Sequence, residues 1–178
     1  MEKRLKYAIF ETKWGFFGFL ADEKGLLRTS LPLRTYQSAK KYLLVGMFGY
    51  ANKDNELYPE LQKRITAYYK GSYVDFSSCN LPPIHWNGSD FACKVLKVCK
   101  EIPLGKIITY SQLAKRAGVP KAARAAGSVL AKNPLPLIVP CHRVIRSDGK
   151  VGNFSAPGGG RTKKKMLKYE KRVAIRLR

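Results

Sequence analysis

The sequence predicts a mixed α+β protein with a small N-terminal antiparallel sheet domain, residues 1–83, and a mainly helical C-terminal helix-turn-helix domain, residues 84–178. Short aromatic and aliphatic runs separated by glycine fill the first part, which is typical of strands joined by tight turns. Helical hydrophobic spacing and helix caps dominate the second part. The segment 77–88, which contains two adjacent prolines, is expected to link them.

Three strands and one helix are expected in the N-terminal part. Tyr7–Phe10 and Trp14–Leu20 are apolar and aromatic runs, and Gly25–Leu31 follows an acidic turn signal. The helix spans 59–69, where large apolar residues recur at helical spacing. A chain of 178 residues is long enough for one domain or two small ones.

The first helices of the C-terminal part have clear start and stop signals. Apolar residues outline an amphipathic helix over 91–102, which stops before Pro103. Thr109 and Gln112 form the Thr-x-x-Gln pattern of a capping box, which opens the helix 112–117. Gly118 ends that helix.

A second short helix, 121–131, completes a helix-turn-helix, with Pro120 at its first position. Its surface is nearly smooth, because Ala, Gly and Ser dominate and Arg124 is its long cation. A helix that reads bases in the major groove normally presents several polar side chains. The pattern favours sequence-independent contact in the minor groove with distortion of the duplex. The alternative is a small-residue helix packed against another helix.

The charge balance predicts a polyanionic partner. The formal net charge is +22, from 34 basic and 12 acidic residues, which favours nucleic acid over a merely basic, soluble protein. No long apolar span is present, so a membrane partner is not expected. The first residues lack the apolar core of a signal peptide, which predicts a cytoplasmic protein, or a nuclear one in a eukaryote, with reduced thiols.

The string Pro140–Val144 carries the chemistry, because it places the Cys141 thiol beside His142 and Arg143. Cationic and imidazole groups lower the pKa of a thiol and favour the nucleophilic thiolate. Adjacent side chains of an extended segment point to opposite sides, so His142 is expected to act through a water or across a sharp turn. A structural core cysteine and a cysteine hydrolase are the alternatives.

The other cysteines do not suggest a metal site. Cys79, Cys93 and Cys99 are irregularly spaced, and together with His85 they fit no common zinc pattern.

The stretch from Ile107 to Glu170 resembles the O6-alkylguanine-DNA alkyltransferases, a family of direct-reversal DNA repair proteins. The matching motifs recur in the family's order and spacing: Ile108–Ala114, Ala122–Gly127, Asn133–Pro134, Pro140–Ile145 and Gly152–Ser155. Residues 1–85 are similar to the family's variable N-terminal domain. The resemblance implies a ribonuclease H-like first domain and a winged-helix-like second domain, which binds DNA and transfers the alkyl group.

The resemblance also implies an activity. The alkyl group of O6-alkylguanine, or of O4-alkylthymine, would move from a flipped-out nucleotide of double-stranded DNA to Cys141. The reaction would be irreversible and single-turnover, because water does not hydrolyse a thioether under mild conditions. No metal or organic cofactor is implied, and the protein is expected to act as a monomer.

Catalytic roles carry over from the family position by position. Cys141 would accept the alkyl group, His142 would deprotonate it through a water, and Glu170 would orient and charge-stabilise His142. Asn133 would brace the active-site turn. Tyr110 would donate toward guanine N3 and offset charge on the leaving base.

Further positions would contact the substrate or the DNA. Arg124 would fill the stack that the rotated nucleotide leaves, and the Ser155 N–H would bond O6. The carbonyls of Cys141 and Val144 would accept from the exocyclic amine, and Pro140 would form a pocket wall. The remaining members of the expected binding set are Ala123, Gly127, Phe154 and Arg143.

Three features set this chain apart or leave alternatives open. Phe154 stands where the family often has Tyr, and the loop 156–161 is longer than the usual Gly-rich link. The basic tail 161–178 fits either a solvated helix face or added phosphate contacts.

Two other functions fit the sequence less well. A relative that only binds the lesion would lack the acceptor cysteine, which is present here. A helix-turn-helix regulator would show polar base-reading residues on its second helix, and this chain lacks them.

Overall fold

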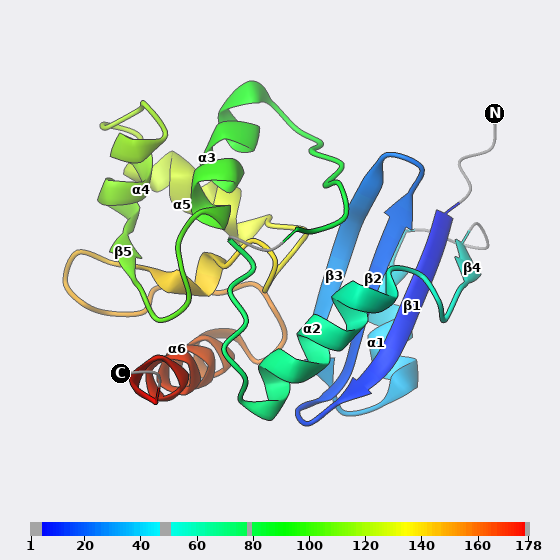
Figure 1. Ribbon diagram of the computed structural model, residues 1–178. Coiled ribbons are helices and arrows are strands. Elements are labelled where there is room, and N and C mark those ends of the chain that lie inside the picture. The colour runs from blue at the N-terminus through cyan, green and yellow to red at the C-terminus, as the bar shows by residue number, and fades with distance from the viewer. Residues whose placement is uncertain (1–4, 47–50, 78–79, 177–178) are drawn as a thin grey trace. The chain divides into compact units, whose positions relative to one another are not determined.

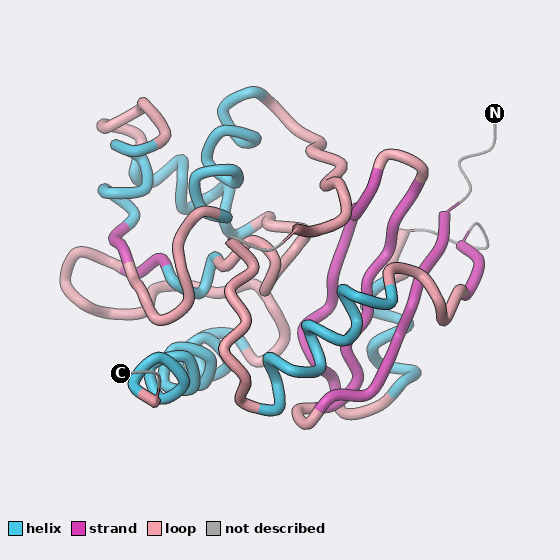
Figure 2. The backbone as a smooth tube through the Cα atoms, in the orientation of Figure 1, coloured by secondary structure: helices cyan, strands magenta, loops and turns pink. Residues whose placement is uncertain are grey.

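The computed structural model describes residues 5–46, 51–77 and 80–176, and they form two compact units (Figures 1 and 2). The first unit comprises the described residues up to Val74 together with Asn80–Trp86, and the second comprises 75–77 and 87–176. The boundary expected after residue 83 therefore falls inside a segment that belongs to the first unit.

The first unit is built on a four-stranded sheet with the order β3-β2-β1-β4. The three predicted strands are confirmed as β1 (Leu5–Thr12), β2 (Gly15–Asp22) and β3 (Gly25–Leu33), which pair antiparallel. The sheet is nevertheless mixed, because the short β4 (Ala51–Lys53) pairs parallel with β1. A parallel neighbour requires a crossover connection, and the chain between β3 and β4 contains helix α1.

Two helices cover the two faces of this sheet (Figure 1). The predicted helix is confirmed as α2 (Pro59–Lys70), whose Tyr69 ring packs against Phe17. Helix α1 (Tyr36–Leu43) was not predicted; Thr35 caps it by accepting a hydrogen bond from the Ser38 N–H. Its buried face packs against the other side of the sheet, in a hydrophobic cluster with Leu5, Tyr7, Ile9 and Leu20.

The second unit is mainly helical. Its elements are α3 (Asp90–Lys100), β5 (Ile108–Thr109), α4 (Tyr110–Arg116), α5 (Ala123–Ala131), the 3-10 turn Cys141–Arg143, β6 (Val144–Ile145) and α6 (Gly159–Ile175). The capping box is confirmed: the Gln112 N–H donates to Thr109 Oγ1 over 3.1 Å, and the Thr109 N–H donates to Gln112 Oε1 over 2.7 Å. The short strands β5 and β6 pair parallel.

The expected start of α5 at Pro120 was wrong. The Ala122 N–H donates to the Val119 carbonyl over 2.9 Å and closes a turn with Pro120 at its second position. Proline suits that position because its fixed φ matches a β-turn. The helix itself begins at Ala123.

The long Gly-rich loop expected over 156–161 was also wrong, because Gly159, Gly160 and Arg161 belong to α6. Gly158, with φ 83°, forms the cap, and the Thr162 hydroxyl donates to the Pro157 carbonyl over 2.7 Å.

None of the described helices combines the length and the apolar character that crossing a bilayer requires.

Candidate active site

Cys141 lies in a 3-10 turn, not at the end of an extended run. The apolar run before it bends, since Leu137 has φ 78° and Pro136 forms a bridge with Val139. In a 3-10 turn successive side chains lie roughly 120° apart. The sharp turn expected as one solution to the adjacency of Cys141 and His142 is therefore present.

His142 and Arg143 both bind Glu170 of helix α6 inside the unit. His142 Nε2 donates to Glu170 Oε1 over 2.8 Å. The Arg143 guanidinium donates to both carboxylate oxygens over 2.9 Å and also to the Ile102 carbonyl. His142 and Arg143 are fully buried, and Glu170 is 1% exposed. Such a two-pronged Arg–carboxylate pair fixes Glu170 in position.

The electrostatics of this trio favour a neutral imidazole beside an ionised carboxylate. Burial lowers the pKa of His142, although Glu170 counteracts this. Burial alone would raise the pKa of Glu170, but His142 and Arg143 hold it well below its usual range. Because Glu170 accepts from Nε2, the lone pair of the imidazole lies on Nδ1. Nδ1 is buried and has no hydrogen-bond partner among the described residues, so it is free to take a proton.

The side chain of Asn133 binds the Cys141 thiol. Its Nδ2 donates to Cys141 Sγ over 3.1 Å and to the Val139 carbonyl over 2.8 Å, while its Oδ1 accepts from the Leu135 N–H over 3.0 Å. Burial raises the pKa of the Cys141 thiol, and the Asn133 hydrogen bond and the Lys163 charge act in the opposite direction. The surroundings thus keep the cysteine protonated at rest and stabilise the thiolate when it forms.

Lys163 is a site residue that the sequence reasoning missed. It lies on α6, is fully buried, and its Nζ donates to Tyr110 Oη over 3.4 Å. The ammonium also lies 5.5 Å from the centre of the Tyr110 ring and 6.0 Å from that of Phe154. Burial lowers the pKa of Lys163 and raises that of Tyr110. The available signal was the seven-residue spacing to Glu170, which puts both side chains on one face of a helix.

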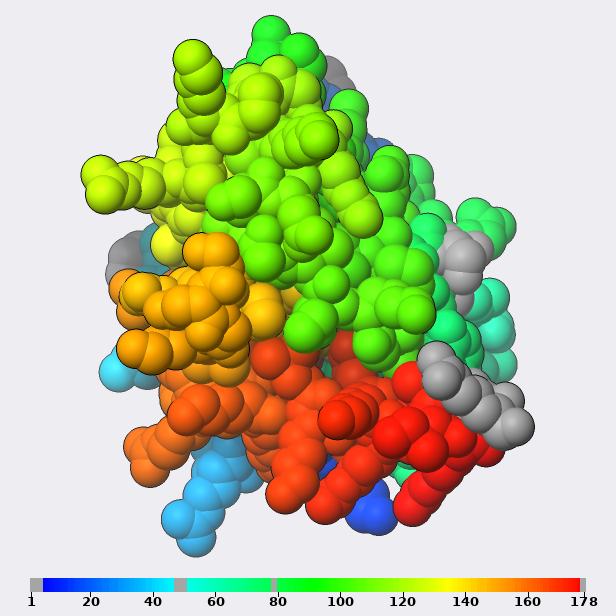
Figure 3. Space-filling view, turned by 90° about the vertical axis from the view of Figure 1, so that its left-hand side faces the viewer, coloured from blue at the N-terminus to red at the C-terminus, as the bar shows by residue number. Residues whose placement is uncertain are grey.

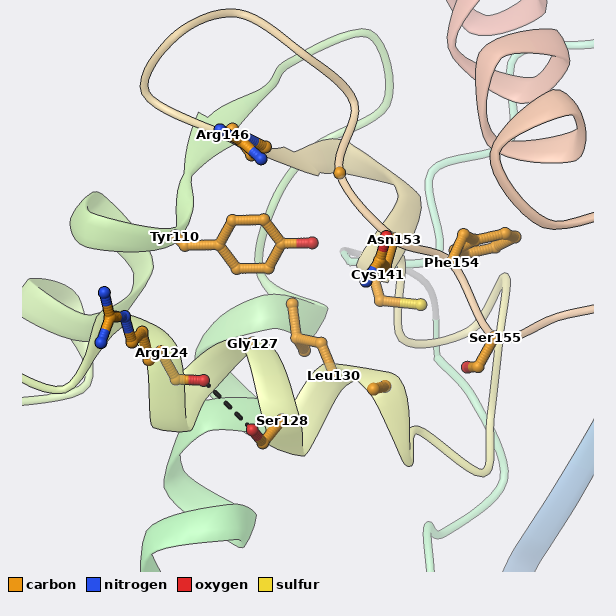
Figure 4. A pocket seen from close by; sticks show the side chains of 12 residues that line it. Tyr110, Arg124, Gly127, Ser128, Leu130, Cys141, Arg146, Asn153, Phe154 and Ser155 are labelled. Atoms are coloured by element: carbon orange, nitrogen blue, oxygen red, sulfur yellow. Dashed lines mark hydrogen bonds between the residues drawn. The ribbon is translucent and has the colours of Figure 1, made fainter.

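Cys141 opens into a pocket of about 340 Å³ (Figure 4). The pocket is lined by Tyr110, Arg124, Gly127, Ser128, Leu130, Ala131, Cys141, Arg146, Gly152, Asn153, Phe154 and Ser155. The structure thus brings together six predicted residues: Tyr110, Arg124, Gly127, Cys141, Phe154 and Ser155. Ala123 lines an adjoining hollow, which shares Tyr110, Arg124, Gly127 and Arg146 with the pocket.

Two glycines make room around Tyr110. Gly152 has φ 71°, and a Cβ there would lie 3.3 Å from Tyr110 Oη. A side chain at this position would be strained and would press on the hydroxyl. Gly127 faces the Tyr110 ring, which would lie 3.7 Å from an added Cβ.

Three predicted binding residues line neither the pocket nor the adjoining hollow. Pro140 and Val144 are buried and flank the 3-10 turn that holds Cys141. The expectation that Arg143 contacts substrate or DNA needs correction, because its guanidinium is fully buried and engaged by Glu170 and Ile102. Within the described chain, no group of three or more His, Cys, Asp or Glu side chains is placed to hold a metal ion; Cys79 lies outside the described residues.

Comparison with known proteins gives consistent matches. A family model described as the DNA binding domain of 6-O-methylguanine DNA methyltransferase matches residues 90–172. A methylated-DNA–protein-cysteine methyltransferase of Rattus norvegicus is 48% identical over 91 residues, which cover 49% of this chain and 43% of that protein. The chain thus spans less than half of the rat protein. A protein of the same name from Methanosarcina acetivorans is 35% identical over 164 residues, or 92% of this chain and 97% of that protein.

Solved structures agree with the fold. The structure described as Mycobacterium tuberculosis OGT in complex with DNA matches with a TM-score of 0.77 and 26% identity, over 94% of both chains. An O6-methylguanine-DNA methyltransferase from Pyrococcus kodakaraensis, at 22% identity, matches with a TM-score of 0.68 and so shares the fold. Because the chain is 35% identical to the Methanosarcina acetivorans protein over 97% of that protein's length, it belongs to the methylated-DNA–protein-cysteine methyltransferase family.

Proposed function

We propose that this protein repairs DNA by direct reversal, moving an alkyl group from guanine O6, or from thymine O4, to Cys141 Sγ. One observation carries the proposal: the thiol borders the pocket, and it belongs to the same 3-10 turn as a buried imidazole whose Nδ1 is free and whose Nε2 is fixed by Glu170. This is the arrangement of an activated nucleophile.

Each proton and electron pair in the transfer has a defined destination. The Cys141 proton passes through a water to His142 Nδ1, and the resulting imidazolium is stabilised by Glu170. The thiolate attacks the alkyl carbon, so a C–S bond forms while the C–O bond breaks and its electron pair stays on the base. Tyr110 Oη donates a proton toward N3 of the leaving guanine, and the Lys163 ammonium stabilises the phenolate. The thioether persists, so one protein molecule repairs one base.

The DNA-binding part of the proposal rests on α5. Its buried side chains include Ala126 and Leu130, whereas Arg124, Ala125 and Ser128 are exposed. A smooth surface with one long cation suits close approach to a minor groove, with Arg124 filling the stack after the nucleotide rotates out. Ala123 and Gly127 would lie along the backbone, the Ser155 N–H would bond O6, and the carbonyls of Cys141 and Val144 would receive the exocyclic amine. Pro140 would support that wall of the pocket.

We further propose that residues 84–178 form the DNA-binding and alkyl-transfer domain, with a winged-helix-like fold. The N-terminal domain, 1–83, would be ribonuclease H-like, which the strand order β3-β2-β1-β4 supports. The protein would act as a monomer on double-stranded DNA, in the cytoplasm or in a nucleus. The transfer would need neither a metal nor an organic cofactor.

Intact-protein mass spectrometry tests the proposal directly. The protein is mixed with duplex DNA that carries one O6-methylguanine, beside Cys141→Ala and the matched control Cys93→Ala, which removes a partly exposed thiol. We expect one added methyl group per repaired base in the wild type and the control, and none in Cys141→Ala. Tight binding to the lesion without any mass gain would leave a recognition protein and overturn the transferase proposal.

A further inference from the structure

Helix α6 has two chemically opposite faces. Its buried face carries Lys163, Met166, Glu170 and Val173, and so contributes two side chains to the Cys141 site. Its exposed face, here called the basic face, consists of Arg161, Lys164, Lys165, Lys168, Lys171 and Arg172. With 3.6 residues per turn, the two sets lie on opposite sides of the helix axis. Figure 3 shows the outer side of α6 at the surface, coloured from orange to red.

The basic face has no acidic counterpart on its own helix. Glu170 is the only acidic side chain after Asp148, and it is buried against His142 and Arg143. Among the described residues, no carboxylate forms an ion pair with Arg161, Lys164, Lys168, Lys171 or Arg172. Like charges three and four residues apart destabilise a helix, so this pattern is costly unless a polyanion covers it.

The dimensions of the basic face suit a row of phosphates. From Arg161 to Arg172 the helix rises about 16 Å, at 1.5 Å per residue. Phosphates of one DNA strand follow each other about every 3.4 Å along the duplex axis, so several of them can meet this face.

A lipid surface fits the face less well. Membrane-surface helices bury large apolar side chains in the bilayer while basic residues contact the headgroups. The apolar residues Met166 and Val173 of α6 are buried within the protein, and Ile175 is the exposed large aliphatic residue at its end. The face therefore offers charge without a side that could enter lipid.

The position of the face indicates which phosphates it would meet. It lies on the side of α6 away from Lys163, whose ammonium contacts Tyr110 in the pocket. The pocket is lined by α5 and by the loop of Arg146, so DNA that inserts a base into it would contact both. Phosphates on the outer side of α6 must then belong to a different stretch of backbone.

We propose that the basic face of α6 binds the phosphate backbone of a second DNA segment while the pocket engages the first. This inference rests on the proposed function, in which DNA is the polyanion that the protein binds. Two sites on one molecule allow transfer between segments without full dissociation, which speeds the search for rare lesions. The second site is independent of sequence, because phosphate contacts carry no base information.

A duplex-bridging assay tests the proposal. One lesion-free duplex is fixed to beads, and capture of a second, labelled duplex is measured with the full-length protein. The variant combines Lys164→Gln, Lys168→Gln, Lys171→Gln and Arg172→Gln. The matched control makes the same charge change on exposed lysines of the first unit: Lys13→Gln, Lys24→Gln, Lys41→Gln and Lys70→Gln.

We expect the wild type and the control to capture the second duplex, and the captured label to fall at least tenfold with the α6 variant. All three should alkylate Cys141 equally fast with a free O6-alkylguanine base, which needs no phosphate binding. The salt dependence of duplex binding, as log K against log salt, should also become shallower by about 0.9 for each phosphate that the variant no longer neutralises.

Other outcomes overturn the proposal. Capture by the α6 variant that equals the control, or no capture by the wild type, removes the second DNA site. Binding of the wild type to phosphatidylserine vesicles that duplex DNA does not displace would assign the face to a lipid surface instead. Failure of transfer to the free base in the wild type would count against the proposed function alone, because bridging is measured without it.

Discussion

The 2.8 Å hydrogen bond from His142 Nε2 to Glu170 Oε1 connects the turn of Cys141 to helix α6. Both side chains are buried, so the bond is not weakened by competing water. It selects the imidazole tautomer whose lone pair is on Nδ1 and prepares a countercharge for the imidazolium. The position of His142, the general base of the proposed reaction, is therefore set by a residue that follows it by 28 positions in the sequence.

Replacing Glu170 with Gln should slow alkyl transfer on the order of a hundredfold, within the range that general-base catalysis contributes. The neutral amide cannot stabilise the imidazolium, and it removes the carboxylate that pairs most closely with the buried Arg143 charge, leaving Asp75 Oδ1 at 3.7 Å from Nη1. The free energy of unfolding should fall by about 3–5 kcal/mol for that second reason. Single-turnover rates with a free alkylguanine base, measured on protein shown to be folded, check the first effect. Glu101→Gln, at an exposed carboxylate, is the control and should change neither quantity.

The ionisation of Glu170 should make the stability of the folded protein depend on pH. The folded-state pKa of Glu170 lies far below its unfolded value of about 4.3. A depressed carboxyl pKa stabilises the folded state above the unfolded pKa, and that contribution is lost as pH falls toward the folded pKa. The free energy of unfolding of the wild type should therefore drop steeply below about pH 4.3. Urea titrations over this range should give a smaller drop for Glu170→Gln; equal slopes in both proteins would contradict the assignment.

Asn133→Asp separates the two roles of the Asn133 amide. The variant keeps an oxygen for the Leu135 N–H but loses the Nδ2 donor to Cys141 Sγ and adds negative charge. The pKa of the Cys141 thiol should rise, because a thiolate loses its hydrogen bond and gains a repulsive neighbour. Transfer to a free base at neutral pH should slow roughly tenfold, with partial recovery at higher pH, since one pKa unit changes the thiolate fraction about tenfold. Asn87→Asp, in an exposed loop, should leave the pH profile unchanged.

Arg124→Ala should distinguish base extrusion from chemistry. Arg124 is exposed on α5 and lines the pocket, and no hydrogen bond or ion pair among the described residues joins its guanidinium to the Cys141 turn. Removing the side chain that fills the stack costs part of the unstacking energy, which is a few kcal/mol per base. Repair of duplex DNA should slow on the order of tenfold or more, whereas transfer to a free base should be unchanged. Lys121→Ala, at an exposed position before the same helix, is the control; a slow reaction with the free base would refute the role.

The sequence predicted the fold best where local chemistry decides it. Thr109 and Gln112 form a capping box from their own side chains, and the strand turns at Gly15 and Gly25 need the positive φ of glycine. Burial was harder to predict, because it depends on which segments pack together. A run of lysines in a basic tail gave no sign that Lys163 would be fully enclosed while Lys164 stays exposed. For the same reason, Arg143 was expected at the DNA but is packed against Glu170.

Lys163→Met should lower activity and at the same time preserve or increase stability. Lys163 is a buried cation whose Nζ donates to the Tyr110 hydroxyl over 3.4 Å, so its charge is held away from water at a cost. Methionine has a similar length and packs well, and replacing buried charge by apolar groups is often neutral or stabilising by roughly 1–4 kcal/mol. Without the ammonium, however, nothing at this position lowers the pKa of Cys141 or stabilises a Tyr110 phenolate. Transfer to a free base should slow roughly tenfold at neutral pH, and the deficit should narrow as pH rises and the thiol ionises without help.

The control for Lys163 is its neighbour on the opposite face of α6. Lys164→Met removes one exposed charge and should change neither the rate with a free base nor its pH profile. If Lys163 had a purely structural role, the transfer rate and the free energy of unfolding of Lys163→Met would fall together. The loss of rate would then not depend on pH. Opposite movements of activity and stability can arise only if the protein keeps this ammonium beside Tyr110 for its charge, at the expense of packing.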